Sequence, residues 1–198
     1  MRIPLSHRGV DFRSAVMTGL LVFIAPAIGA QTVTQIIDAT GDVTNGLDYP
    51  AGIAVDAAGN VCVGGRDSNN AFRITPGGVI EQIIDSTGDG GFNGLSAARW
   101  VAVDGSGNFY LTGAVSDNVF RIEASTTCST GGTPCTITEI INEDGDGSSK
   151  LDYPIGVAVG PTGNVFVAGY GSHNAFRIDA PTTCSTGGTP CTITEIID

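Results

Sequence analysis

The side chains in this sequence that could do chemistry are mostly carboxylates in glycine-rich stretches, together with one histidine. Aspartates that gather at the mouth of a channel could bind a polar ligand. The candidate ligand-binding residues are Asp42, Asp48, Asp89, Asp146, Asp152 and His173. In the alternative interpretation, the Asp-Gly and Asn-Gly pairs of these stretches shape long turns, and we favour it.

A metal ion is the second chemistry that the acidic stretches could support. Asp144 and Asp146 stand in Asp-Gly-Asp-Gly-Ser, which offers the alternating oxygen ligands that calcium prefers. An EF-hand loop needs a glycine and a glutamate where this stretch has Ser149 and Ile155. We therefore expect no bound cofactor, with calcium at Asp144 and Asp146 as the alternative.

Nucleophilic catalysis has little support in the sequence. His173 is the only histidine outside the first thirty residues, and Ser172 is its direct neighbour, a spacing that seldom brings two side chains into productive contact. The sequence has no Gly-x-Ser-x-Gly elbow, phosphate-binding loop or dinucleotide fingerprint. We expect a protein that is not an enzyme.

Four of the five cysteines come from two copies of the phrase TTCSTGGTPCTIT. In an exported protein this spacing favours two local disulfides over a shared zinc site, because six intervening residues exceed the usual zinc spacing. The predicted disulfides are Cys128 with Cys135 and Cys184 with Cys191. Cys62 aligns with Tyr110 and Phe166 in the repeats described below, so we expect it in the core.

Residues 1–30 have the pattern of a secretory signal peptide. Arg2, Arg8 and Arg13 precede an apolar stretch at 16–28, and small residues allow cleavage after Ala27 or after Ala30. A membrane-spanning helix needs roughly 20 apolar residues, and this stretch is shorter. Cleavage would leave 31–198 as a secreted or periplasmic protein with no membrane partner.

The net charge of the chain argues against a nucleic-acid partner. The 198 residues carry 9 basic and 20 acidic side chains, a net charge of −11. Residues 1–30 hold three basic residues and one acidic residue, so the remainder has 6 against 19, or −13. A nucleic-acid ligand would require a basic face. We expect instead an unknown protein or glycan as the ligand.

Three copies of one phrase predict the architecture. They read GIAVDAAGNVCVGGRDSNNAFRI from Gly52, WVAVDGSGNFYLTGAVSDNVFRI from Trp100 and GVAVGPTGNVFVAGYGSHNAFRI from Gly156. The units span 52–84, 100–142 and 156–198, each with four short strands, and one further strand is expected at 34–38. Four-stranded units of this length indicate an all-β fold, a β-propeller of antiparallel blades with three blades plus one extra strand.

The blade pattern also orients its side chains. The loop between the second and third strands and the connection to the next blade leave a blade at the same edge, which would collect the candidate aspartates. In the repeated Phe-Arg-Ile of the third strand, the arginine points away from its two apolar neighbours. The expected ion pairs are Arg73, Arg121 and Arg177 with Glu81, Glu139 and Glu195.

The phrase G-[IV]-A-V-D-x-x-G-N-[VF]-[YFC]-[VL], followed by N-x-F-R-I, resembles the NHL-type repeats of bacterial six-bladed propellers over 34–198. The resemblance implies the propeller fold and is nearly silent on activity, because blades of this type serve binding modules, scaffolds and some enzymes alike. Some similar propellers are calcium-dependent lactonases of the gluconolactonase group, whose sites combine acidic and amide side chains from several blades. Asp56 and Asp104 could belong to such a set, but Gly160 interrupts it, so we expect these aspartates to cap turns.

The number of blades raises the question of closure. Closed propellers have four to eight blades, so three predict either part of a longer propeller or a half-propeller whose homodimer completes six blades. The expected function is that of an exported, non-catalytic module that binds or scaffolds through its acidic loop edge. The alternative is a calcium-dependent hydrolase that is incomplete in this chain.

Overall fold

The computed structural model describes residues 32–124, 135–179, 181–184 and 191–198. The chain divides into two compact units, Met1–Thr34 and Gln35–Asp198. Of the first unit only 32–34 are described, so the predicted signal peptide at 1–30 lies outside the described residues. Within the described residues, no helix is long and apolar enough to cross a membrane.

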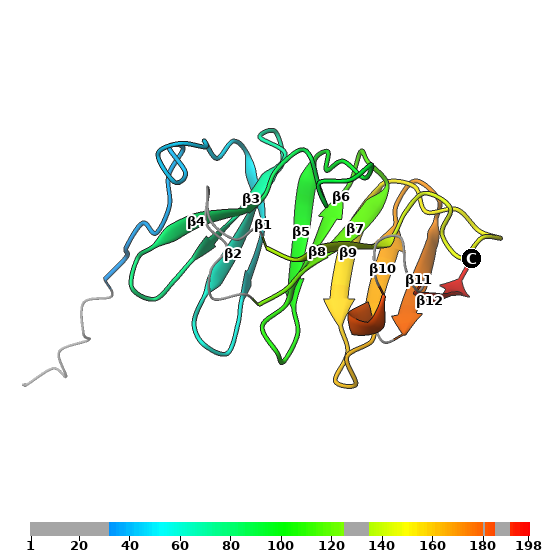
Figure 1. The fold of residues 1–198 in the computed structure, drawn as a ribbon. Helices are drawn as coiled ribbons and strands as arrows, with labels where there is room; N and C mark the ends of the chain where they lie inside the picture. Colours follow the sequence, from blue (N-terminus) through cyan, green and yellow to red (C-terminus); the bar gives the residue numbers. More distant parts are fainter. Residues whose placement is uncertain (1–31, 125–134, 180, 185–190) are drawn as a thin grey trace, which may run out of the picture. The chain divides into compact units, whose positions relative to one another are not determined.

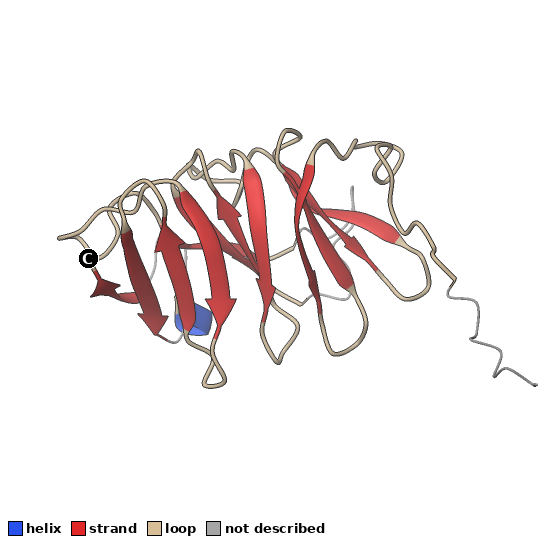
Figure 2. Cartoon of the chain, turned by 180° about the vertical axis from the view of Figure 1, so that it is seen from behind, coloured by secondary structure: helices blue, strands red, loops and turns tan. Residues whose placement is uncertain are grey.

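The second unit contains three antiparallel sheets, each with four strands in chain order (Figure 1). Blade 1 consists of β1 (Pro50–Val55), β2 (Val61–Gly65), β3 (Asn70–Ile74) and β4 (Ile80–Ile84). Blade 2 consists of β5 (Ala98–Val103), β6 (Phe109–Gly113), β7 (Asn118–Ile122) and β8 (Ile137–Ile141). Blade 3 consists of β9 (Pro154–Val159), β10 (Val165–Gly169), β11 (Asn174–Asp179) and β12 (Thr192–Ile197). The all-β prediction of antiparallel four-stranded blades is confirmed, and one short 3-10 turn, η1 (Pro181–Thr183), is the helical element that Figure 2 shows.

The first strand of each blade lies next to the first strand of the following blade, since β1 contacts β5 and β5 contacts β9. These are therefore the inner strands, as in a propeller. Tight turns join them to the second strands: the N–H of Asp56 donates to the carbonyl of Asn60 at 3.0 Å, and Gly59 adopts φ 84°. Only glycine takes this left-handed conformation without strain.

The segment expected as an extra strand, 34–38, joins none of the three sheets. Its Ile37 nevertheless packs against the buried cluster of Leu47, Val63, Phe72 and Ile74 in blade 1. A fourth strand pairs with the third strand of its own blade, and within the described residues no such strand lies beside 34–38. The segment thus occupies a position before blade 1 without a hydrogen-bonded ladder.

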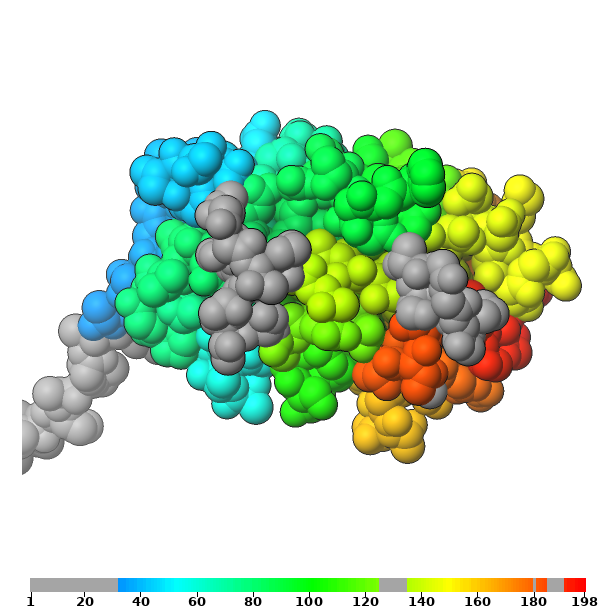
Figure 3. Space-filling view, viewed as in Figure 1, coloured from blue at the N-terminus to red at the C-terminus, as the bar shows by residue number. Residues whose placement is uncertain are grey.

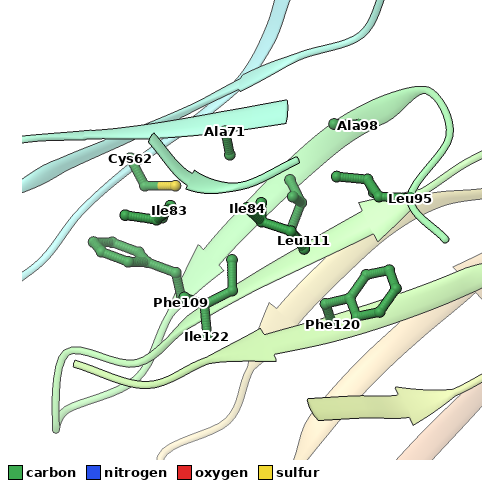
Figure 4. Close-up of a cluster of buried hydrophobic side chains, with 10 residues drawn as sticks. All are labelled: Cys62, Ala71, Ile83, Ile84, Leu95, Ala98, Phe109, Leu111, Phe120 and Ile122. Carbon is green, nitrogen blue, oxygen red and sulfur yellow. The ribbon is translucent and has the colours of Figure 1, made fainter. Parts of the chain in front are cut away.

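The hydrophobic core lies between consecutive blades. Figure 4 shows the cluster between blades 1 and 2, in which Ile83 and Ile84 of β4 lie beside Phe109 and Leu111 of blade 2. An equivalent cluster joins blades 2 and 3. Phe120 is fully buried, and an aromatic ring of this size contributes about 2–3 kcal/mol when it leaves water.

The structure tests two of the cysteine predictions. Cys184 and Cys191 form a disulfide with their Cα atoms 5.0 Å apart, as predicted. Cys62 is a free thiol with no exposed surface, and its burial raises its pKa, so the expectation of a core residue is confirmed. The predicted partner of Cys135, Cys128, lies outside the described residues.

The ion pairs predicted for the arginines of the third strands are confirmed in blade 1 and wrong in blades 2 and 3. Arg73 pairs with Glu81, which lies directly opposite it in the ladder. Arg121 pairs instead with Glu123, and Arg177 with Asp179. The ladder places Thr138 opposite Arg121, so Glu139 is one residue out of step and points to the other face of the sheet.

Candidate binding site at the loop edge

One edge of blades 1–3 is formed by the connections 38–49, 85–97 and 142–153 and by the loops 66–69, 114–117 and 170–173, and we call it the loop edge. In each blade the two segments are hydrogen-bonded: the N–H of Arg66 donates to the carbonyl of Tyr49, and the N–H of Tyr170 to that of Tyr153, both at 3.1 Å. Figure 3 shows the three connections in blue, green and yellow along the same edge. The prediction that these segments share an edge is confirmed.

A pair of polar side chains repeats in all three blades and fixes the loop edge. Ser116 Oγ donates to Asn118 Oδ1 at 2.7 Å and accepts from the N–H of Ser96 at 3.0 Å. Asn118 Nδ2 donates to the carbonyl of Gly94 at 3.0 Å. The equivalent bonds are made by Ser68 with Asn70 and by Ser172 with Asn174. We call this arrangement the Ser-Asn brace.

Each brace requires a glycine at the end of the second strand. A Cβ on Gly113 would lie 2.2 Å from Ser116 Oγ and 2.4 Å from Asn118 Oδ1. The sequence signal is therefore G-x-x-S-x-N, which occurs from Gly65, Gly113 and Gly169. The three copies make this pattern visible in the sequence alone.

Three of the predicted ligand-binding aspartates cap turns inside their own connections. Asp42 Oδ1 accepts from the N–H groups of Thr44 at 3.0 Å and Asn45 at 2.7 Å. Asp89 accepts from the N–H of Gly91 and from Asn93 Nδ2, both at 2.9 Å. These bonds are those of the turn-shaping alternative.

Asp146 is held in the same way. Its Oδ1 accepts from the N–H groups of Ser148 and Ser149, both at 2.9 Å, and these bonds lower its pKa. Asp144, the second candidate metal ligand, is exposed in the same connection. Among the residues that the structure describes, no group of three or more acidic, histidine or cysteine side chains is arranged to hold a metal ion.

The remaining candidates lie closer to the inner strands. The backbone N–H groups of Asp48 and Asp152 donate to Ser68 and Ser172 of the braces. The carboxylate of Asp152 lies so close to Gly171 that a Cβ there would be 2.5 Å from its Oδ2. His173 is exposed and has φ 58°.

His173 occupies the position of Asn69 and Asp117 in the earlier blades. Those two residues join their blades to the next one, because Asn69 Oδ1 accepts from the N–H of Ala97 at 2.7 Å and Asp117 Oδ1 from that of Tyr153 at 2.8 Å. By its position in the repeat, His173 therefore lies where a blade meets the next one, and not within the acidic connections.

Tyrosine and arginine side chains, which the sequence prediction did not single out, form two groups of contacting side chains beside the inner strands. The guanidinium of Arg66 lies 3.7 Å from the ring centroid of Tyr49, and that of Arg99 lies 5.2 Å from that of Tyr153. The ring centroids of Tyr153 and Tyr170 are 6.2 Å apart. We call these five residues the Tyr-Arg strip; it draws on all three blades.

The strip is both charged and strained. Arg66 forms an ion pair with Asp67, and the hydrogen bond from Arg66, together with the charge of Arg99, lowers the pKa of Asp67. The Nε atom of Arg99 is buried and has no hydrogen-bond partner within the described part of the chain. Tyr49 and Tyr153 have φ values of 51° and 49°, a conformation that is uncommon for bulky residues and that concentrates at ligand-binding positions.

A hollow of about 480 Å³ lies on the loop edge of blade 2, between the connections that precede and follow this blade, with Phe92, Val115 and Glu139 among its lining residues. Burial raises the pKa of Glu139 to about 7, and the nearby charges of Asp89 and Glu143 act in the same direction. The Phe92 side chain is fully exposed at its rim. The hollow therefore combines a mainly polar lining with the exposed ring of Phe92 and a carboxyl group, that of Glu139, whose pKa is raised.

At the opposite edge, Asp56 and Asp104 cap the turns after the inner strands. Asp104 accepts from the N–H of Ser106, the N–H and Nδ2 of Asn108, and the hydroxyl of Tyr110. Asp56 makes the equivalent bonds to Ala58 and Asn60. These contacts agree with the expected turn-capping role. At Gly160 of blade 3 the turn keeps its backbone bonds, and a Cβ there would lie 3.1 Å from the ring of Phe166.

The comparison with known proteins defines the class. No protein-family model and no curated protein matches the chain. A luciferin-regenerating enzyme superposes with a TM-score of 0.54 at 12% identity, covering 84% of this chain and 51% of that one. A streptogramin B lyase gives 0.50 at 16%, covering 75% and 40%, and the virginiamycin B lyase from Staphylococcus aureus gives 0.49 at 18%, covering 75% and 41%.

The three sheets, together with the luciferin-regenerating enzyme and the streptogramin B lyase, define a β-propeller fold with three blades in the described residues. The chain spans between 40% and 51% of the length of these solved proteins. At such low sequence identity the likeness extends to the fold alone, so the activities in their titles are not transferred to this chain.

Proposed function

We propose that this chain belongs to an exported NHL-type β-propeller that binds a protein ligand through its loop edge and catalyses no reaction. The observation that carries the proposal is the Tyr-Arg strip. Tyrosine and arginine dominate the binding energy of protein interfaces, because they combine a large contact area with directed polar groups. Tyr49 and Tyr170 are 57% and 64% exposed, which leaves their surfaces open to a partner.

The strip is also preorganised. The backbone bonds between Arg66 and Tyr49 and between Tyr170 and Tyr153, together with the Ser-Asn braces, hold the loops that carry it. A surface that is rigid before binding loses less conformational entropy when the partner docks.

Export is supported by the cysteine chemistry. The disulfide between Cys184 and Cys191 is stable in oxidising compartments and rare in the cytosol. The acidic composition and the sequence of 1–30 agree with a secreted or periplasmic location.

The experiment is a comparison of captured ligands. The chain and its Tyr153→Ala and Arg66→Ala variants are immobilised and exposed to the exported fraction of the organism that encodes it. We expect one or more proteins retained by the wild type to be lost from both variants, while Lys150→Ala, on the same edge but outside the strip, retains them. If the immobilised chain retains only glycans, the ligand is a glycan and the proposal of a protein ligand is wrong. Calcium-dependent turnover of lactones would establish the hydrolase alternative and refute the non-catalytic proposal.

A further inference from the structure

The hollow on the loop edge of blade 2 joins exposed apolar side chains to acidic ones. Phe92 is fully exposed and Val115 is 60% exposed, and both line the hollow. Glu139 and Glu143 are its charged groups, and among the described residues that line it there is no lysine, arginine or histidine. The hollow of about 480 Å³ therefore carries negative charge that no basic side chain of its own lining balances.

Phe92 belongs to an insertion in the connection before blade 2. This connection, 85–97, has 13 residues, whereas its equivalents in the other blades, 38–49 and 142–153, have 12 each. The extra residue falls within GDGGFNGL, which corresponds to GDVTNGL and GDGSSKL. Because the Phe92 ring is fully exposed, it adds nothing to the hydrophobic core and is available for contact with another molecule.

The carboxylate of Glu139 keeps one oxygen available for a ligand. Its Oε1 accepts from Asn118 Nδ2 at 3.0 Å, and among the described residues this is the one donor to the carboxylate. In blade 3, by contrast, the hydroxyl of Ser149 donates to Oε2 of the equivalent Glu195 at 2.6 Å. Blade 2 has no such hydroxyl, because Asn93 takes the place of Ser149 in the repeat.

The surroundings of Glu139 favour a bound cation. Its pKa of about 7 results first from burial and then from the negative charges of Asp89 and Glu143, while the hydrogen bond from Asn118 acts in the opposite direction. A positive charge in the hollow would stabilise the ionised carboxylate. Binding of a cation and ionisation of Glu139 are therefore coupled, and the cation should bind more tightly above pH 7 than below it.

We infer that the hollow of blade 2 binds an arginine side chain of the protein partner. The inference rests on the proposed protein-binding function and names the chemistry that this part of the loop edge recognises. A guanidinium has five N–H donors in one plane, so it can donate to Oε2 of Glu139 while its face lies on the ring of Phe92. Its alkyl stem can lie against Val115. A lysine ammonium would match the charge but has no planar face for the aromatic ring.

The hollow is structurally linked to the Tyr-Arg strip. Ser116 and Asn118 of the brace line the hollow. Asp117, the residue between them, accepts from the N–H of Tyr153 in the strip at 2.8 Å. A stable protein interface covers roughly 800 Å² on each partner, so one partner that docks on the strip can also place an arginine in the hollow.

The first test is an NMR titration of the isotope-labelled chain with N-acetylarginine amide. We expect saturable shifts of the backbone amide signals of Asn93, Gly94 and Val115, and no such shifts with N-acetylcitrulline amide, which has the same shape without the charge. Glu139→Gln should weaken the binding by about tenfold, because it removes the charge-assisted hydrogen bond. Glu195→Gln, the same change at the equivalent position of blade 3, is the matched control and should bind as the wild type does.

The aromatic ring and the pH dependence are tested with the same probe. Phe92→Ala should weaken the binding by about two- to fivefold, whereas Val43→Ala, an equally exposed side chain in the connection before blade 1, should leave it unchanged. The affinity of the wild type should fall about tenfold from pH 8 to pH 6, as the carboxyl group with a pKa of about 7 takes up its proton. Glu139→Gln should lose most of this dependence. Equal binding of the arginine and citrulline probes, or undiminished binding of the arginine probe by Glu139→Gln, would overturn the inference.

Capture from the exported fraction separates this inference from the proposed function. Proteins that the wild type retains and Tyr153→Ala loses should also be lost from Glu139→Gln and should be released by added N-acetylarginine amide. Proteins that Glu139→Gln retains and Tyr153→Ala loses would leave the proposed function intact and overturn the arginine contact. Binding of the arginine probe without capture of any protein would support the guanidinium site and overturn the protein-binding function.

Discussion

Asn118 Nδ2 donates a hydrogen bond of 3.0 Å to Glu139 Oε1, and the same amide donates to the carbonyl of Gly94. This relationship links the brace of blade 2 to a carboxyl group in its fourth strand. Asn174 and Glu195 repeat it in blade 3, also at 3.0 Å. In blade 1 the equivalent of Glu139 is Gln82, which carries no charge.

The raised pKa of Glu139 predicts a pH-dependent contribution to stability. Its folded-state pKa of about 7 lies above the unfolded value, so the folded chain binds this proton more tightly. The resulting stabilisation is present in full below the unfolded pKa and is lost as the pH rises toward 7. Glu139→Gln, which copies blade 1, should therefore increase the free energy of unfolding at pH 8 by about 1 kcal/mol after allowance for solvent screening.

Urea unfolding at pH 4 and pH 8 would measure this effect. The gain from Glu139→Gln should be largest at pH 8 and close to zero at pH 4, where the carboxyl group is protonated in both states. Glu81→Gln is the control, because it removes the partner of Arg73 and should destabilise the chain at pH 8. An equal gain from Glu139→Gln at both pH values would contradict the assignment.

The Ser-Asn brace predicts a large loss on truncation. Asn118→Ala removes the donor to the carbonyl of Gly94 and the acceptor for Ser116 in a site where Asn118 is 3% exposed. Leaving buried polar groups without partners should cost about 2–3 kcal/mol in the free energy of unfolding. Ser106→Ala, an exposed turn serine, should change it by less than about 0.5 kcal/mol. Equal effects of the two variants in chemical denaturation would show that the brace contributes nothing.

The glycine before each brace gives a prediction about steric space. Gly113→Ala would place a methyl group 2.2 Å from Ser116 Oγ, so the brace must shift and the chain should lose about 2 kcal/mol or more. Gly105→Ala meets no atom within 4 Å and should be neutral or stabilising by up to about 1 kcal/mol. Thermal unfolding of the two variants side by side measures the difference, and a stable Gly113→Ala variant would show that the brace can move freely.

The disulfide of blade 3 predicts a moderate contribution to stability. Cys184 and Cys191 close a loop of eight residues, for which the chain-entropy model gives about 2.5 kcal/mol. The double variant Cys184→Ala/Cys191→Ala should lower the free energy of unfolding by about this amount under oxidising conditions. Unchanged denaturation curves would mean that the loop is already constrained in the unfolded chain.

The repeated phrases made the blades predictable. Because strand alternation, turn residues and the period of the units are local properties of the sequence, they located β1–β12, the edge that carries the loops and the pairing of Cys184 with Cys191. The same local logic identified turn-capping as the favoured role of Asp42 and Asp104, whose partners lie within a few residues.

Register and neighbourhood required the tertiary structure. A shift of one residue between β7 and β8 moved Glu139 away from Arg121 and toward Asn118, because successive side chains of a strand point to opposite faces. The Tyr-Arg strip contains residues from three blades that are far apart in the sequence, so no spacing in the sequence predicts it. The sequence by itself determined which residues form blades and caps, since those depend on near neighbours along the chain. Only the folded arrangement decided which side chains of different blades meet, because those contacts join residues far apart in the sequence.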